Sequence, residues 1–250
     1  MRLCLPWNLH LIVEQPIVVI PTYNEIDNIG SVIEKVLVQD SRLSILVVDD
    51  NSPDGTGDIV ERIGLGNNRV NILNRPRKEG LGKAYREGIS KALELGADVV
   101  IQMDADLSHP PEKLPEMLQE IEHCDFVIGS RYLHGVAVVN WPIERLFLSW
   151  FGNVYARKVT GLPIRDLTGG FRCVRRQILE KCKLEDIRST GYAFQIELNY
   201  RLVKSGGSNK EIGFVFIDRL QGDSKISHQS IREAIWIPWW LRIQEKLGKL

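Results

Sequence analysis

The feature that most constrains the fold is an alternation of short apolar runs with segments of helical periodicity through the first 130 residues. The apolar runs are rich in β-branched residues, which is typical of strands buried on both faces. We predict strands at 17–20, 43–48, 70–73, 98–103 and 126–129, with helices between them at 28–38, 58–63, 82–95 and 111–121. Strands and helices that alternate in this way predict an α/β fold, a mostly parallel Rossmann-like sheet with helices on both faces.

The second half of the chain follows a different pattern but shows no linker or low-complexity tract. Its predicted elements are helices at 144–159 and 194–203, a loop at 168–172, a strand at 212–217 and an apolar end at 231–241. We therefore expect it to complete the same domain. The predicted organisation is a loose N-terminal extension over 1–15, one domain over 16–228 and a C-terminal amphipathic helix over 229–250.

Charge and cysteine content exclude several classes of function. The 32 Lys and Arg residues balance 32 Asp and Glu residues, so no global basic field is present to hold nucleic acid. The cysteines are scattered without zinc or redox spacing, and we expect free thiols in a reducing compartment: Cys4, Cys124, Cys173 and Cys182. No run approaches the roughly 20 apolar residues of a membrane span.

Polar clusters follow three of the predicted strands, at 22–25, 49–55 and 104–109. Ligands of open α/β sheets bind beyond the carboxyl ends of the parallel strands. Because all three clusters fall at such ends, we expect them to meet at one edge of the sheet. The sequence therefore predicts a binding site there.

The sharpest chemical motif is Asp104-Ala105-Asp106, directly after the strand at 98–103. Two carboxylates separated by one small residue can face one point from a tight turn, and hard divalent cations prefer oxygen ligands and bridge to phosphate oxygens. The alternative interpretation is a solvated turn. The two further acidic loops at the same edge favour a metal site that neutralises a nucleotide diphosphate.

Other charged residues have two interpretations each. Asp50 is placed to accept hydrogen bonds from a nucleobase, although the cluster at 49–55 also suits turn formation. Cations around Gly80-Leu81-Gly82 form either a phosphate loop or an exposed basic loop: Arg75, Arg77, Lys78 and Lys83. Arg219 and Lys225 flank a turn at 221–224, where they either close over an anion or lie on the surface.

Six segments, taken in order, resemble the glycosyltransferase family 2 enzymes. They are 20–25 (IPTYNE), 47–56 (VVDDNSPDGT), 103–111 (MDADLSHPP), 129–132 (GSRY), 140–142 (NWP) and 166–172 (DLTGGFR). The first three mark the broad family. The later three are similar to the polyprenyl-phosphate (dolichol-phosphate) mannose synthase branch, and the match runs over nearly the whole chain.

The resemblance implies a GT-A fold and inverting transfer of mannose from GDP-mannose to a polyprenyl or dolichyl phosphate. By matching position, it implies a nucleotide pocket lined by Pro21, Tyr23, Glu25, Val48 and Asp50. It implies donor contacts from Asp104 and Ala105, with Mg²⁺ or Mn²⁺ held by Asp106. Ser108 stands where relatives often carry a metal-assisting Gln, which leaves the metal preference open. The implied phosphate-binding residues are Arg131, Arg145, Arg219 and Lys225.

The expected mechanism is a single displacement by the lipid phosphate, with Asp104, Asp106 and Arg145 as the catalytic set. A phosphate monoester is already anionic at neutral pH, so it needs no strong general base. Open alternatives are a UDP-glucose or other nucleotide-sugar donor, a sugar-nucleotide pyrophosphorylase, and a subunit that binds nucleotide without turnover.

Lipid acceptors require a membrane surface, and we expect a peripheral protein on its cytoplasmic face. Membrane contact would come from exposed aromatics, for which burial in the core is the alternative: Trp150, Phe151, Trp236, Trp239 and Trp240. Some relatives use a small membrane subunit instead, so such a partner stays open as well.

Overall fold

A computed structural model describes residues 13–217 and 228–250, and seven strands of these residues form the main sheet. Its strands are β1 Pro16–Thr22, β2 Ser44–Asp49, β3 Val70–Asn74, β4 Val99–Gln102, β5 Phe126–Ser130, β7 Arg172–Arg175 and β8 Asn209–Gly213. They lie in the order β3-β2-β1-β4-β7-β5-β8, and only β7 runs antiparallel to its neighbours. The predicted mostly parallel sheet is confirmed.

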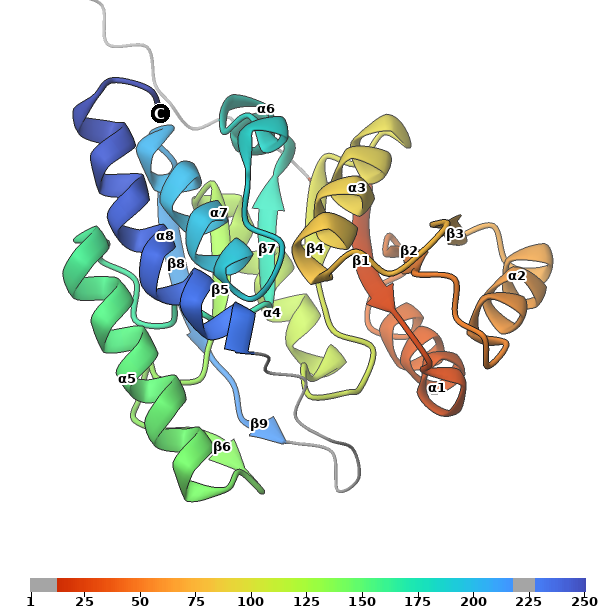
Figure 1. Ribbon diagram of the computed structural model, residues 1–250. Coiled ribbons are helices and arrows are strands. Elements are labelled where there is room, and N and C mark those ends of the chain that lie inside the picture. Colours follow the sequence, from red (N-terminus) through yellow and green to blue (C-terminus); the bar gives the residue numbers. More distant parts are fainter. Residues whose placement is uncertain (1–12, 218–227) are drawn as a thin grey trace, which may run out of the picture.

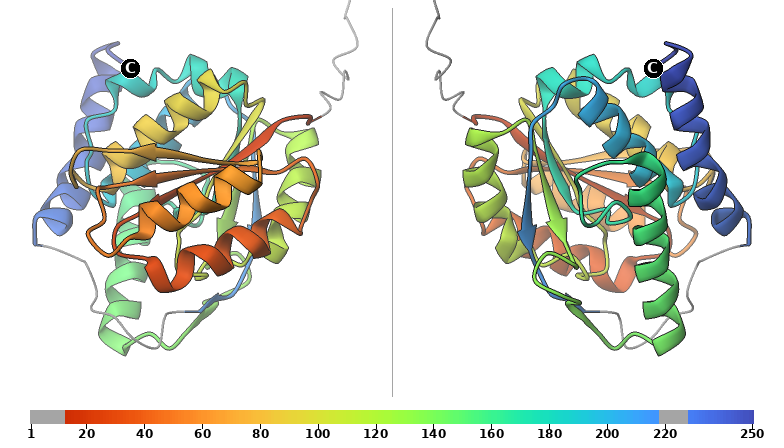
Figure 2. Two further views of the ribbon diagram at one scale, coloured as in Figure 1. Left: turned by 90° about the vertical axis from the view of Figure 1, so that its right-hand side faces the viewer. Right: turned by 90° about the vertical axis from the view of Figure 1, so that its left-hand side faces the viewer.

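Helices cover both faces of the sheet, as predicted (Figures 1 and 2). The described helices are α1 Ile26–Leu37, α2 Thr56–Gly66, α3 Leu81–Glu94, α4 Leu114–Glu120, α5 Ile143–Thr160, α6 Arg176–Lys181, α7 Ala193–Lys204 and α8 His228–Lys246. One core cluster joins the sheet to α1, α2 and α4, and a second joins it to α3 and α5 to α8.

The central strands are apolar throughout because each face of the sheet is buried. In β1, Val18 and Ile20 enter the core under α1, while Ile17 and Val19 enter the core under α3. Successive side chains of a strand point to opposite faces, so a strand buried on both sides needs apolar residues at every position. This is why the sequence shows unbroken apolar runs here rather than alternation.

The structure departs from the prediction in the second half. The strand β7 was missed, since it begins with Arg172 in the segment predicted as a loop. The predicted strand at 212–217 is wrong as one element. It divides into the end of β8 and the short β9 Phe216–Ile217, which pairs with β6 Val138–Val139 in a separate two-stranded sheet. Between them the Phe214 N–H donates to the Ser130 carbonyl at 3.3 Å, so the contact with β5 continues to this residue.

The C-terminal helix α8 packs against α5 and α7 (Figure 1). Its described residues are His228–Lys246. Ile237 and Leu241 are buried in the core, and Glu245 forms an ion pair with Lys204 of α7 at 2.6 Å. Apolar burial and this ion pair therefore attach α8 directly to the domain.

The N-terminal prediction falls largely on residues 1–12, which lie outside the described part of the chain. The three residues before β1 are attached to the domain. Val13 is buried, and the Asp98 carboxylate accepts hydrogen bonds from the Glu14 and Gln15 N–H groups at 2.6 and 3.1 Å.

The cysteines of the described residues, Cys124, Cys173 and Cys182, are free thiols, as expected. Burial raises the pKa of Cys182 to about 12 and that of Cys124 to about 11. Both thiols are therefore protonated at neutral pH, and because a thiol reacts as its thiolate, they are chemically quiet packing groups.

The close packing of α3 on the sheet depends on Gly88. A Cβ added at this glycine would lie 2.6 Å from Val19 Cγ1 and 2.7 Å from Val48 Cγ2. We expect Gly88→Ala to lower the free energy of unfolding by about 1–3 kcal/mol, because an extra methyl group forces the helix away from a packed core. Urea denaturation measures this. Gly30→Ala in α1, where nothing lies within 4 Å, is the matched control and should be neutral or stabilising.

Candidate active site

The loops after β1 and β2 are joined directly at the carboxyl edge of the sheet, as the sequence predicted. The Asn24 N–H donates to Ser52 Oγ at 3.0 Å, and the Thr22 hydroxyl donates to Asp49 Oδ1 at 2.9 Å. Asp49 also accepts hydrogen bonds from the Ser52 N–H and hydroxyl at 2.8 and 2.6 Å. The Asp49 carboxylate therefore shapes the turn, whereas Asp50 does not take part in these bonds.

Each of the three edge loops contains one non-glycine residue with positive φ. These residues are Asn24 at 58°, Asn51 at 59° and Leu107 at 60°. Asparagine tolerates this left-handed region, but leucine adopts it only where the surrounding structure imposes it. Strained backbone concentrates at binding sites, which supports the assignment of this edge as the site.

Asp104 is held from two sides. The Tyr85 hydroxyl of α3 donates to Asp104 Oδ1 at 2.9 Å. The backbone N–H of Asp104 donates to His109 Nδ1 at 3.0 Å. The imidazole of His109 stacks on the ring of Phe171, with centroids 4.9 Å apart. Burial lowers the pKa of His109 below its ordinary 6.5, so the ring is neutral at pH 7 and carries its proton on Nε2.

Neither Tyr85 nor His109 was among the predicted site residues. His109 is the last residue of the acidic cluster at 104–109, and this position in the sequence could have indicated that it belongs to the site. Tyr85 lies on the buried, apolar face of α3, so the sequence did not indicate a role for it in the site. Only the packing of α3 on the sheet brings its hydroxyl to Asp104.

Asp106 is oriented by Ser108, whose N–H and hydroxyl donate to Asp106 Oδ1 at 3.1 and 2.5 Å. Within residues 13–217 and 228–250, no cluster of three or more His, Cys, Asp or Glu side chains could hold a metal alone. The donors at this loop are carboxylate and hydroxyl oxygens, which suit a hard divalent cation that takes its remaining ligands from phosphate oxygens and water. The residues therefore fit a Mg²⁺-type ion shared with a diphosphate.

Asp50 is buried in an ion pair with Arg75 Nη1, and the Nε of Arg75 donates to Glu87 Oε2 at 2.8 Å. Burial raises the pKa of Asp50 above its ordinary value, even though the Arg75 charge acts in the opposite direction. Arg75 thus supplies the counter-charge for a buried carboxyl group at the edge of the sheet.

The cations around 80–82 are paired with acids of their own segment. Glu79 contacts Arg77 at 3.1 Å and Lys83 at 2.7 Å, and Arg75 is in the buried network. These pairs favour the interpretation as an ionic surface loop over that of a phosphate loop. Lys78 differs, since its ammonium group lies 4.0 Å from the centroid of the Tyr23 ring.

The other residues predicted to contact the donor lie at the same edge with different exposure. Pro21 and Tyr23 are half-buried, and Glu25 is buried with its Oε2 accepting from the Asn28 amide at 2.9 Å. Ala105 is buried beside the core. The side chain of Val48 is fully buried under α3, so only its backbone can face a ligand.

Arg131 forms a bidentate ion pair with Asp166, with both N–O distances at 2.7 Å, and its Nη2 also donates to Thr168 at 2.8 Å. Both residues are buried. The ion pair and the Thr168 bond use Nε and Nη2 of Arg131. A phosphate bound by Arg131, as predicted, would have to use Nη1 or displace one of these partners. Asp166 additionally accepts from the Asn153 amide and the Gly169 N–H, so it connects α5 to the loop before β7.

The Asp166 pair has a consequence for acid stability. Burial alone would raise the pKa of Asp166, but the charge and hydrogen bonds of Arg131 lower it from 3.8 to about 2. A carboxyl group whose pKa is lower in the folded than in the unfolded protein stabilises the fold. This contribution to the free energy of unfolding is complete above the unfolded-state pKa and is lost as the pH falls through the folded-state pKa. We expect the free energy of unfolding to fall by about 2 kcal/mol from this group between pH 4 and pH 2.

Urea titrations at a series of pH values measure this contribution. The Asp166→Asn variant should lack this part of the pH dependence, so the difference between wild type and variant should shrink toward pH 2. A constant difference over that range would contradict the assignment.

Arg145, in the first turn of α5, lies over the ring of Trp141 at 4.5 Å from its centroid. Trp141 packs edge-on against Phe216 at 5.3 Å, and Phe216 lies close to His109. An aromatic cluster therefore connects Arg145 to the loop that carries Asp104. Arg219 and Lys225, the predicted basic loop, lie outside the described residues and stay predictions.

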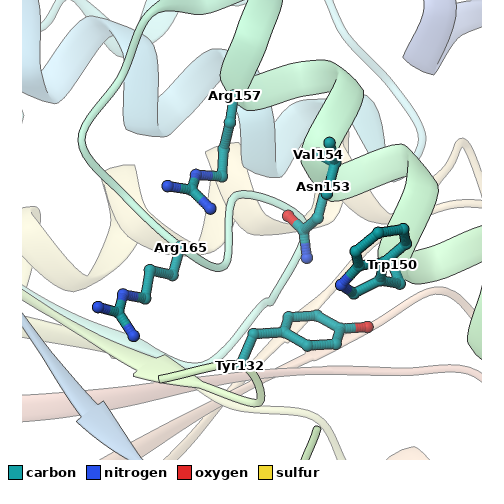
Figure 3. A pocket seen from close by; sticks show the side chains of 6 residues that line it. All are labelled: Tyr132, Trp150, Asn153, Val154, Arg157 and Arg165. Atoms are coloured by element: carbon teal, nitrogen blue, oxygen red, sulfur yellow. The ribbon is translucent and has the colours of Figure 1, made fainter. Parts of the chain in front are cut away.

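A pocket of about 330 Å³ lies beside α5 (Figure 3). It is lined by Tyr132, Trp150, Asn153, Val154, Arg157 and Arg165. The two guanidinium groups line one end and the two aromatic rings the other, with the amide of Asn153 between them. The pocket is therefore basic and adjoins the Asp166 network through Asn153.

Helices α5 and α8 lie side by side and expose many large apolar side chains (Figure 1). On α5 and α8 these are Ile143, Phe147, Leu148, Trp150, Phe151, Ile235, Trp236, Trp239 and Ile243. Trp240, in contrast, packs on the core. The sequence left surface exposure and core burial open for these tryptophans, and the neighbours Trp239 and Trp240 show one each. In the described part of the chain, no helix has the length and apolarity to cross a membrane.

The fold is shared with solved glycosyltransferases of the GT-A type. Glucosyl-3-phosphoglycerate synthase from Mycobacterium tuberculosis, in a complex with Mn²⁺, uridine diphosphate and phosphoglyceric acid, superposes with a TM-score of 0.65. The identity is 18%, over 90% of this chain and 78% of that one. The chain therefore has the predicted GT-A-like fold.

Residues 17–183 match the model of glycosyl transferase family 2, and the chain belongs to this family. It is 42% identical to polyprenol monophosphomannose synthase of Mycolicibacterium smegmatis, over 92% of this chain and 88% of the relative. It is 40% identical to undecaprenyl-phosphate mannosyltransferase of Micrococcus luteus, over 87% and 89%. The protein is a glycosyltransferase, which decides against the pyrophosphorylase alternative.

Proposed function

We propose that this protein transfers mannose from GDP-mannose to a polyprenyl monophosphate, with inversion at the anomeric carbon. The observation that carries the proposal is the identity of 40–42% to two enzymes named for mannosyl transfer to polyprenyl phosphates, over nearly the whole chain. The oriented carboxylates of Asp104 and Asp106 at the sheet edge support it, because such a reaction needs a diphosphate leaving group to be neutralised.

In this proposal Asp50, with Pro21, Tyr23 and Glu25, binds the nucleotide at the ends of β1 and β2. Asp106, with help from Ser108, would hold Mg²⁺ or Mn²⁺, which would supply positive charge for a leaving diphosphate. Asp104 contacts the donor from a position fixed by Tyr85 and His109.

The acceptor phosphate is bound by arginines at the other end of the site. Arg145 presents its guanidinium from the first turn of α5, where the aromatic ring of Trp141 supports it. Arg131, Arg219 and Lys225 complete the set that the family resemblance implies. Catalysis then consists of positioning and charge stabilisation, because the phosphate nucleophile is already anionic.

The exposed apolar side chains of α5 and α8 are the proposed contact with the cytoplasmic face of a membrane. Phe151 and Trp236 have 62% and 59% of their surface exposed, and they lie on two helices that pack together. A patch of large apolar residues on a soluble domain marks an interaction surface. This placement brings the first turn of α5, with Arg145, near lipid-linked phosphates.

Substitution on α5 tests the membrane contact. We expect the double variant Phe147→Ser and Phe151→Ser to bind phosphatidylglycerol-containing vesicles at least about 10-fold more weakly, because each buried Phe contributes roughly 1.5–3 kcal/mol. Vesicle co-sedimentation measures it. Leu65→Ser, at the exposed end of α2, is the control and should bind as wild type does. Equal binding by all three proteins would exclude α5 as the contact.

Transfer of radiolabelled sugar from GDP-mannose into organic-extractable lipid tests the activity. Purified protein is given a polyprenyl phosphate with and without Mg²⁺ or Mn²⁺. Metal-dependent label in the lipid phase supports donor, acceptor and cofactor together. Label only from UDP-glucose would correct the donor. No label from either donor, also after addition of a small membrane subunit, would overturn the proposal.

A further inference from the structure

The basic pocket beside α5 has no role in the proposed transfer reaction (Figure 3). Its volume of about 330 Å³ lies within the range of small-molecule sites, about 300–1,000 Å³. Trp150, Asn153 and Arg157 line it from one stripe of the helix, at positions i, i+3 and i+7. The Tyr155 hydroxyl, on the opposite side, donates to the Ile235 carbonyl of α8 at 2.7 Å. The pocket therefore lies on the flank of α5 that faces away from α8.

The pocket is also separate from the arginine that is proposed to bind the acceptor phosphate. Arg145 lies in the first turn of α5 and Arg157 in the last. A helix rises about 1.5 Å per residue, so the two are about 18 Å apart along the axis. One phosphate group cannot contact both arginines at that separation. A ligand held by Arg157 would therefore be a second one.

The two guanidinium groups at one end of the pocket are available to an anion (Figure 3). Arg165 Nη1 donates to the Leu133 carbonyl, which orients the guanidinium and uses only this nitrogen. Arg157 is exposed, and in the part of the chain that the structure describes no acidic group pairs with it. Guanidinium groups bind the oxygens of phosphate in pairs, through their planar forks. This end of the pocket therefore suits a phosphate oxyanion.

The acidic groups next to the pocket are already bonded elsewhere. Glu211 of β8 accepts from the backbone N–H groups of Arg165 and Asp166 at 2.8 and 3.0 Å. The Asp166 carboxylate is paired with Arg131, so these two charges cancel. The charges of Arg157 and Arg165 together exceed that of Glu211. The pocket therefore keeps a positive excess that an anion can neutralise.

The other end of the pocket is aromatic and continues into the exposed apolar face of α5. Trp150 is 44% exposed, and its ring packs edge-on against that of Phe151, with centroids 5.4 Å apart. Phe151 belongs to the proposed membrane contact, so the pocket lies at the edge of that surface. A membrane bound there would bring the phosphate of an anionic lipid headgroup to this edge, where basic side chains attract it.

We propose that the pocket binds one phosphate oxyanion between Arg157 and Arg165, at a site separate from that of the acceptor phosphate. Its position beside the apolar face favours the phosphodiester of an anionic phospholipid, which would orient the protein on the membrane. A soluble phosphate carries the same oxygens and is the other source of this chemistry. The oxyanion site does not depend on the sugar donor or acceptor, and only its lipid source rests on the proposed membrane contact.

Substitutions that keep the net charge test the lipid source. The double variant Arg157→Lys and Arg165→Lys retains both positive charges but loses the planar forks, and Val154→Trp fills the pocket beside intact arginines. Co-sedimentation gives the lipid preference of each protein, its Kd for phosphatidylcholine vesicles divided by its Kd for vesicles that also contain phosphatidylglycerol. We expect this preference to fall at least about fivefold in both variants, because diffuse attraction to the surface is unchanged while the bidentate contacts are lost.

Inorganic phosphate tests the soluble source. Titration calorimetry in chloride buffer of constant ionic strength gives its Kd for wild type and for both variants. Binding by wild type that weakens at least about fivefold in the variants would support an oxyanion site open to soluble phosphate. A change in lipid preference alone would support a site for the lipid headgroup. Folded variants that match wild type in both measurements would overturn the inference.

The same changes at exposed positions outside the pocket provide the controls. Arg62→Lys in α2 matches the lysine substitutions, and Val38→Trp, directly after α1, matches the added ring. Both controls should keep the lipid preference and the phosphate affinity of wild type. Thermal unfolding close to that of wild type shows that the pocket variants are folded.

Sugar transfer in detergent separates this inference from the proposed function. Without a membrane, the pocket variants should transfer mannose to polyprenyl phosphate at the wild-type rate. A loss of transfer that parallels the loss of phosphate binding would make the pocket part of the acceptor site and would overturn a separate one. If wild type transfers no mannose, the proposed function fails, and the phosphate titrations still decide whether the pocket binds an oxyanion.

Discussion

Replacement of Asp106 by Asn is expected to reduce sugar transfer on the order of 10³-fold, with little change in stability. The amide keeps the shape of the side chain but removes the charge that would hold a divalent cation beside the diphosphate. Ser108 donates two hydrogen bonds to Asp106 Oδ1, and an Asn oxygen can still accept them, so the loop should keep its conformation. Initial rates at saturating Mn²⁺ and donor measure the loss.

Asp186→Asn is the matched control, because Asp186 is exposed and its recorded hydrogen bonds are made by its backbone, from its N–H to the Lys183 carbonyl and from Arg201 to its own carbonyl. It should retain wild-type rates. Thermal unfolding of both variants should lie close to that of wild type. Near-normal turnover of Asp106→Asn under saturating metal would remove Asp106 from the catalytic set.

Replacement of Asp166 by Asn is expected to give the largest loss of stability. Asp166 is fully buried, and its removal leaves the buried guanidinium of Arg131 without its counter-charge. Breaking a buried ion pair from one side costs about 3–5 kcal/mol. For a chain of this size, each kcal/mol corresponds to a shift of roughly 2–4 °C in Tm. Calorimetry and urea denaturation at pH 7 measure both quantities.

The exposed pair of Arg176 and Glu180 on α6 provides the comparison. Glu180→Gln should cost less than about 1 kcal/mol, because exposed ion pairs contribute little. A loss below about 1 kcal/mol for Asp166→Asn as well would show that the Arg131 pair does not stabilise the fold.

Much of the first half of the fold could be predicted from the sequence. Strands buried on both faces, such as β1 and β2, leave unbroken apolar runs, and the helices between them leave apolar residues at every third or fourth position. Once parallel strands are recognised, their carboxyl ends must lie at one edge. The joining of the loops at Asn24 and Ser52 follows from that geometry.

The reversed strand β7 could not be predicted in the same way. It begins with Arg172, whose guanidinium is buried against Gly169, so a charged residue stands where a central strand normally shows an apolar one. The division of the strand at 212–217 was missed because the segment is apolar on both sides of Gly213, the last residue of β8. It exists because β9 pairs with β6.

The sequence by itself determined the α/β class, the sheet edge at which the polar loops meet, and the choice of Asp104 and Asp106 as candidate site residues. These depend on periodicity and on residues close together in the chain. Only the tertiary structure decided the contacts made across long sequence separations. It brings Tyr85 to Asp104 and pairs Arg131 with Asp166. The physical reason is that such contacts depend on how helices pack on the sheet, and local periodicity does not record that packing.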